Sequence, residues 1–348
     1  MAQINKPNEY FNTKLYTGTG SNQSLTGVGF QPDWIWIKRR DASAWHYLFD
    51  SIRGANKTLY SNLNSGETTD SNNLQSFDSD GFTVGTQADM NASGGSLVSW
   101  NWLASNTTAS NTDGSITSTV SANTTSGFSI VSYTGDGAVT ATVGHGLGVT
   151  PKMIIYKNLG NVYNWLVYHE SLGNTHGMYL NGTDASVDNV DFFKDTSPTS
   201  SVWTMSNSTL NNQGSINHIA YCFAEKKGFS KFGSYTGNGQ SEDGPFIYTG
   251  FKPAFVIVKK YDSAGGNWVM WDNKRSDVPN ANVNDQVLYP NASDAELSSA
   301  TREIDTLSNG FKIRGEGGNI NADADNFIYM AFAENPLVGT NNIPATAR

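Results

Sequence analysis

The sequence predicts an all-β protein made of three tandem related antiparallel β-sandwich units of the jelly-roll type. One motif occurs three times, at residues 29–38, 148–157 and 250–259: a glycine, a proline three residues later, an apolar run, and a lysine six residues after the proline. Elsewhere the chain is rich in Gly, Asn, Ser and Thr, and only 15% of its residues are charged. Short apolar runs separated by such turn residues are typical of sandwiches and barrels.

Each repeated run is expected to form the central strand of its unit. The Gly-x-x-Pro turn starts the strand, and β-branched and aromatic residues suit a pleated surface. Because four or five apolar residues follow one another, both faces of the strand should be covered. We expect the lysine that ends each run to return the chain to water. The predicted core positions of these strands are Trp34, Trp36, Ile154, Ile155, Val256 and Ile257.

Motifs before and after the central strands also recur in the same order, which divides the chain into three units. Each unit opens with Tyr-Thr-Gly, at residues 16–18, 133–135 and 235–237. After the central strand comes a run in which Trp45 is matched with Trp165 and Trp268, so these tryptophans are expected in the core. The predicted parts are an N-terminal anchoring arm (1–13), unit one (14–103), a linker (104–126), unit two (127–225), unit three (226–335) and a C-terminal tail (336–348).

Three connecting segments carry their own predictions. The arm contains Ile4, Tyr10 and Phe11, which we expect to pack against unit one or a neighbouring subunit. The linker is extended or flexible, and its residues 115–120 suit an edge strand. Residues 291–300 suit one short helix with a Ser/Asp cap.

Charge and apolar patterning exclude several classes of partner. The formal net charge is −9, which argues against nucleic acid or an anionic membrane as the main partner. No secretory signal opens the chain, and nothing approaches the apolar length of a membrane-spanning helix, so we expect synthesis in the host cytoplasm and no membrane insertion. The single cysteine, Cys222, lies in an apolar run and is expected to be buried.

No catalytic motif stands out, and we expect neither an enzyme nor a cofactor. The five histidines have no metal-ligand spacing. Asp78 with Asp80, and Asp323 with Asp325, could present oxygens to Ca²⁺, although each pair also fits a hairpin turn, which we favour. Trp203 and Trp271 are less regular in the repeats than the other tryptophans, which makes them the candidates for contact with a glycan.

Several stretches resemble a repeat family of tailed-bacteriophage virion proteins, frequent in phages of marine bacteria. The stretches are residues 4–18, 26–40, 50–54, 77–82, 133–137, 144–148, 331–336 and 347–348. The resemblance implies a structural, peripheral virion protein whose sandwich domains loosely resemble lectin and laminin-G folds. It supplies no catalytic residues.

The function expected from this resemblance is that of a tail fibre, appendage or adaptor on the particle surface, involved in host adsorption. Its partners would be other virion proteins, a host receptor or glycan, and further copies of the chain, a trimer by analogy with phage fibres. Ile4, Tyr10 and Phe11 of the N-terminal arm would then be the virion anchor. A capsid decoration or head-fibre protein is the alternative. A lectin module and a glycan depolymerase are two further hypotheses.

Overall fold

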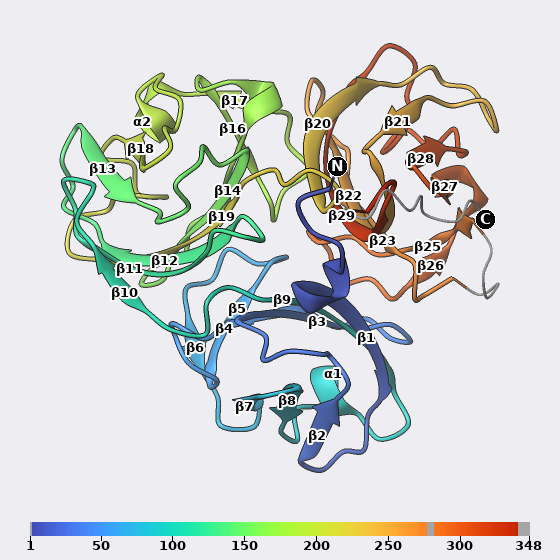
Figure 1. Ribbon diagram of the computed structural model, residues 1–348, viewed down its shortest axis with the longest axis horizontal. Coiled ribbons are helices and arrows are strands. Elements are labelled where there is room, and N and C mark those ends of the chain that lie inside the picture. The colour runs from blue at the N-terminus through green and yellow to red at the C-terminus, as the bar shows by residue number, and fades with distance from the viewer. Residues whose placement is uncertain (1, 277–281, 340–348) are drawn as a thin grey trace.

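The computed structural model describes residues 2–276 and 282–339, which form an all-β protein. Its strands fall into three stretches of chain, called here the first segment (11–102), the second segment (109–223) and the third segment (230–336). The segments lie around a shared centre, with the sheet that contains the central strand of each segment on the inner side (Figure 1). The helices in the described part are single turns: η1 (Pro7–Glu9), α1 (Ala88–Asn91), η2 (Glu170–Leu172), α2 (Val190–Phe193) and η3 (Ala300–Arg302).

The first segment forms two antiparallel sheets, with strand orders β1-β9-β3-β4-β5-β6 and β2-β8-β7. Its strands are β1 (Phe11–Thr17), β2 (Gln23–Thr26), β3 (Trp34–Arg39), β4 (His46–Asp50), β5 (Lys57–Tyr60), β6 (Thr68–Thr69), β7 (Leu74–Asp78), β8 (Gly81–Val84) and β9 (Ser96–Trp102).

The second segment forms an eight-stranded sheet, β10-β11-β12-β19-β14-β15-β16-β17, and a two-stranded sheet, β13-β18. Its strands are β10 (Ala109–Asn111), β11 (Ser118–Asn123), β12 (Phe128–Thr134), β13 (Ala141–Gly144), β14 (Met153–Asn158), β15 (Leu166–His169), β16 (His176–Tyr179), β17 (Val187–Asp188), β18 (Val202–Met205) and β19 (Asn217–Phe223).

The third segment forms three sheets, β20-β29-β22-β23, β21-β28-β27-β24 and β25-β26. Its strands are β20 (Ser230–Thr236), β21 (Phe246–Tyr248), β22 (Phe251–Lys260), β23 (Val269–Asp272), β24 (Val283–Asn284), β25 (Gln286–Val287), β26 (Leu297–Ser298), β27 (Ile304–Leu307), β28 (Gly310–Ile313) and β29 (Asn326–Pro336).

The three inner sheets share one strand order. In each, the central strand lies between the last strand of its segment and the strand that follows the central one, giving β1-β9-β3-β4, β12-β19-β14-β15 and β20-β29-β22-β23. The register agrees too, because the fourth residue after each motif proline has its partner at one equivalent place on the last strand. These pairs are Trp36 with Trp100, Ile155 with Tyr221, and Ile257 with Met330.

Both faces of each central strand are covered, as the apolar runs predict. On β3, Trp34 and Trp36 enter a central cluster that draws side chains from all three segments, whereas Ile35 and Ile37 enter a cluster formed by the first segment alone. Strands β14 and β22 divide their side chains in the same way. All six predicted core positions are buried: Trp34, Trp36, Ile154, Ile155, Val256 and Ile257.

The lysines that end the central strands are buried, and the expectation that they return the chain to water is wrong. Each ammonium group donates to backbone carbonyl oxygens, at least one of them in another segment. Three of the cross-segment acceptors lie two residues after the matched asparagines Asn62, Asn181 and Asn291: Asn64 for Lys157 (3.0 Å), Thr183 for Lys259 (3.4 Å) and Ser293 for Lys38 (3.4 Å). Lys259 also donates to the Asp184 carbonyl of the second segment (3.0 Å).

Backbone hydrogen bonds close the three segments into a ring. Each is donated by one segment to the residue eight positions after the motif proline of the next segment in the ring, so the third segment donates to the first. The bonds run from Glu67 to Leu159 (2.8 Å), from Ser186 to Tyr261 (2.7 Å) and from Glu296 to Arg40 (2.8 Å). Because the third bond returns to the first segment, the arrangement is a closed ring.

The N-terminal arm packs inside the chain's own core. Ile4 and Phe11 belong to the central cluster, and Phe11 stacks on Phe332 of the third segment with ring centroids 5.3 Å apart. Tyr10 is partly buried and meets Phe229 edge-on. Ile4 and Phe11 are therefore not free to serve as the predicted anchor, whereas an anchoring role for the partly buried Tyr10 stays a prediction.

Two predictions for the connecting segments have mixed outcomes. A strand is present in the expected stretch 115–120 as β11, which begins at Ser118, but the prediction that it lies at the edge is wrong, because β10 pairs with its outer side. The expected helix at residues 291–300 is wrong. That stretch contains β26 and makes backbone hydrogen bonds to the first segment at Arg40 and Ala44, which hold it extended. Residues 340–348 of the predicted tail lie outside the described residues.

Candidate functional site

The predicted glycan contacts are core residues. Trp203 and Trp271 are each 1% exposed, and Trp271 donates its indole N–H to the Arg302 carbonyl at 2.9 Å. Trp203 packs edge-on against Tyr133. A sugar stacks on an aromatic face that is open to solvent, so neither tryptophan can serve as the predicted platform.

Trp45, which we expected in the core, is 43% exposed. The hydrogen bonds show that His46, not Trp45, is the residue equivalent to Trp165 and Trp268. The backbone N–H groups of His46, Trp165 and Trp268 each donate to an asparagine side chain, namely Asn62 (3.0 Å), Asn181 (2.9 Å) and Asn291 (2.9 Å). The residues equivalent to Trp45 are therefore Asn164 and Asn267.

The aspartate pairs form turns. Asp80 accepts hydrogen bonds from the backbone N–H groups of Gly27 (2.9 Å) and Gly29 (2.7 Å), which lowers its pKa. Asp78 pairs with Gly81 where β7 turns into β8. At the second pair, Asp325 forms an ion pair with Lys260 at 3.2 Å. No group of three or more His, Cys, Asp or Glu side chains placed to hold a metal occurs among residues 2–276 and 282–339.

Four of the five histidines are buried, and burial lowers their pKa, to about 4 for His169 and His218. His169 lies 3.1 Å from the Tyr329 carbonyl oxygen of the third segment, and His218 lies 2.9 Å from the Ile216 carbonyl oxygen. Their neutral rings therefore act as hydrogen-bonding core groups, as the absence of metal-ligand spacing suggests.

The described residues contain two buried Asp–Arg ion pairs that sequence reasoning missed. Asp50 contacts Arg53 and Asp272 contacts Arg275, each at 2.5 Å, with all four side chains at most 3% exposed. The signal was the repeated Asp-x-x-Arg spacing at residues 50–53 and 272–275. Such pairs are stable only when hydrogen bonds satisfy the remaining polar atoms.

Those remaining hydrogen bonds again join one segment to the next. Asp50 accepts from the Tyr221 hydroxyl of the second segment at 2.8 Å, and Asp272 accepts from the Trp100 indole of the first at 2.9 Å. The indole of Trp165 donates to the Tyr60 carbonyl at 2.9 Å, also across a boundary between segments. The buried polar groups thus hold the ring together.

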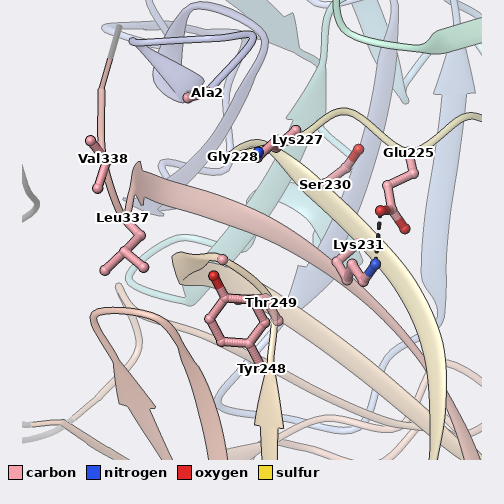
Figure 2. Close-up of a pocket in the computed structure, with 11 residues that line it drawn as sticks. Ala2, Glu225, Lys227, Gly228, Ser230, Lys231, Tyr248, Thr249, Leu337 and Val338 are labelled. Atoms are coloured by element: carbon pink, nitrogen blue, oxygen red, sulfur yellow. Dashed lines mark hydrogen bonds and ion pairs between the residues drawn. The ribbon is translucent and has the colours of Figure 1, made fainter. Parts of the chain in front are cut away.

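A groove of about 450 Å³ lies on the third segment, close to both ends of the described chain. Ser230 and Lys231 of β20 line one side, and Tyr248 of β21 lines the other (Figure 2). Tyr248 is 58% exposed, and Lys231 forms an ion pair with Glu225 at 2.8 Å. The groove is bordered by edge strands of two different sheets.

No helix in the described part of the chain is long and apolar enough to cross a membrane. In comparisons with known proteins, residues 6–336 match the model of a family described as a domain of unknown function, DUF7483. Neither the curated proteins nor the solved structures contain a match.

Proposed function

Because the chain belongs to the DUF7483 family, whose function is unknown, we propose a role from its own residues: a non-enzymatic structural protein of a bacteriophage particle. In this proposal it is a tail fibre, appendage or adaptor component on the particle surface, involved in host adsorption. The sequence resemblance to phage virion proteins motivates the proposal. We also propose that the three segments are tandem related β-sandwich units.

The observation that carries a structural role is the use made of the buried polar groups. Lys38, Lys157 and Lys259, together with the two Asp–Arg pairs, make hydrogen bonds between segments. Buried ionisable groups in a cleft are candidates for catalysis, but ion-pair networks in a scaffold shift pKa values as well. Here their partners are carbonyl groups, ring donors and one another, which favours a scaffold.

The closed ring favours a compact component of the particle, either a tail adaptor or a capsid decoration protein, over a fibre shaft. A fibre shaft is expected to extend along one axis, whereas these segments enclose a common core. A capsid decoration protein or a tail adaptor needs a compact body with several outward-facing loops, and the ring supplies that shape. Homo-oligomerisation, including trimer formation, remains part of the proposal.

Cryo-electron microscopy of the purified particle tests the role. Density for the ring on the tail would support the adaptor or appendage role, and density on the capsid would support the decoration role. Mass spectrometry of particles purified from infected cells should detect the chain. If the chain is absent from the particles and is found only in the unassembled fraction of the lysate, the proposal of a virion protein is wrong.

A further inference from the structure

The groove on the third segment corresponds to a place that the second segment fills with its own chain. Strand β11 pairs with β12, the first strand of its inner sheet, with Ala122 opposite Ser129 and Asn123 opposite Phe128. Upstream, Ile116 forms a parallel bridge with Val143 of β13. Residues 116–123 therefore link the edges of two sheets, and the buried Ile116 and Val120 join the core of the second segment.

The register identifies the matching residues of the third segment. Phe128 and Ser230 both lie opposite the final phenylalanine of the last strand, Phe223 and Phe332 respectively. Ser230 and Lys231 are thus equivalent to Phe128 and Ser129, the residues that pair with Asn123 and Ala122. Both Ser230 and Lys231 line the groove.

The opposite side of the groove matches as well. Counted from the motif glycines Gly148 and Gly250, Gly146 is the residue equivalent to Tyr248. A Cβ atom on Gly146 would lie 3.1 Å from Cβ of Ala122 and 3.3 Å from Cγ2 of Val120. In the second segment, residues 120–123 therefore lie where the third segment has its groove.

The chain itself explains why this place is open. Twenty-three residues, 104–126, precede the second unit, but only Lys226 and Lys227 join the second unit to the third. A two-residue connection cannot supply a strand. Among the described residues, β20 is consequently an edge strand of its sheet, and unpaired edges accept further strands readily.

We propose that the groove binds an extended segment of a partner protein, which adds to β20 as an antiparallel strand and ends in a carboxylate. The carboxylate follows from charge. In the antiparallel register the carboxyl end of the incoming strand lies beside Ser230, on the side of Lys227. The side chain of Lys227 is exposed and forms no ion pair within the part of the chain that the structure describes. We expect the rest of the incoming strand to carry small, uncharged side chains, because the residues that fill the equivalent place in the second segment, 115–123, are Ser-Ile-Thr-Ser-Thr-Val-Ser-Ala-Asn.

A synthetic peptide of residues 115–123 with a free C-terminal carboxylate, labelled at its N-terminus, is the probe, and fluorescence anisotropy at low salt measures its affinity for the full chain. The proposal predicts saturable binding that Lys227→Glu weakens by about fivefold or more, as does amidation of the peptide. The matched control, Lys274→Glu, changes the charge of another exposed lysine outside this groove and should alter affinity by less than about twofold. Proline at both positions derived from Val120 and Ser121 should abolish binding, because successive N–H groups point to opposite sides of a strand and one of these two must face β20.

Four outcomes would overturn the proposal. The first is the absence of saturable binding at millimolar peptide, and the second is an equal loss in the two lysine variants, which would indicate a general charge effect. Binding that appears only after removal of residues 340–348 would make the chain's own end the occupant. Concentration-dependent self-association that Lys227→Glu abolishes, measured by light scattering, would make a second copy the occupant.

Discussion

The ammonium group of Lys157 donates a hydrogen bond to the carbonyl oxygen of Asn64, 3.0 Å away and in the preceding segment. It also donates to the Tyr163 carbonyl, and its side chain has no exposure to solvent. Lys38 and Lys259 repeat this contact at the other two boundaries. A buried ammonium group needs several hydrogen-bond acceptors, and for each of these lysines a loop of another segment supplies one of them. Burial of the lysines therefore depends on the contact between segments, and the contact in turn is stabilised by the lysines.

Stability should rise with pH between about 7 and 9.5. Burial lowers the pKa of Lys157 to about 7 and the pKa of Lys38 and Lys259 to about 8, whereas an unfolded lysine titrates near 10.4. In this window the unfolded chain binds more protons than the folded chain, so the free energy of unfolding increases with pH, by up to about 1.4 kcal/mol per pH unit for each group.

Urea denaturation at several pH values checks this rise. Lys157→Met should reduce the slope of the free energy of unfolding against pH, whereas Lys6→Met, at an exposed lysine, should leave the slope unchanged. A free energy of unfolding that falls from pH 7 to 9.5 would contradict the buried lysines.

Removing one partner of a buried ion pair should be costly. Asp272→Asn removes one of the two carboxylates that neutralise the buried Arg275 and leaves only its ion pair with Glu296 at 2.8 Å, so we expect a loss of about 1.5–3 kcal/mol in the free energy of unfolding. Asp41→Asn breaks an exposed pair with Arg39 and should cost less than about 1 kcal/mol. Thermal or urea denaturation of both variants measures the difference, and equal losses would refute the structural importance of the buried pair.

Cys222 should be unreactive in the folded chain. Its strand, β19, lies between β12 and β14, and its side chain is buried in the core of the second segment. Burial raises the pKa of the thiol, which disfavours the reactive thiolate. A thiol reagent should therefore label no cysteine in native buffer and one per chain after denaturation. Rapid labelling of the native protein would contradict the placement of β19 in the middle of its sheet.

Acrylamide should quench one tryptophan efficiently. Of the nine tryptophans, Trp45 is the exposed one, while the other eight are buried. Trp45→Phe should remove most of the quenchable emission, and Trp203→Phe should remove none of it. Efficient quenching that Trp203→Phe or Trp271→Phe abolishes would restore those residues as candidates for glycan contact.

How far the sequence predicts this structure depends on the range of the interactions. Apolar runs such as the one containing Trp34 and Trp36 indicate strands covered on both faces, because the signal is local. The match of Trp45 with Trp165 failed because strand register, not residue type, decides which residues are equivalent. Ile37 and Tyr156, each five residues after the motif proline, pair with Tyr47 and Leu166, so the residues before these two, His46 and Trp165, are equivalent.

The site was less predictable than the strands. A lysine after an apolar run ordinarily reaches water, and nothing near Lys157 in the sequence reveals an acceptor 93 residues away. The same applies to Asp272, whose indole partner, Trp100, belongs to the first segment. The groove could not be foreseen either, because it arises where the short connection between the second and third segments leaves the edge of β20 uncovered.

Calorimetric unfolding tests the central claim, that the three segments form one body around a shared core. Because the central cluster contains side chains from all three segments, we expect a single transition, with equal calorimetric and van't Hoff enthalpies. Asp272→Asn should move that whole transition to lower temperature. Two or three separate transitions, only one of which responds to Asp272→Asn, would show that the segments unfold independently and would contradict the closed ring.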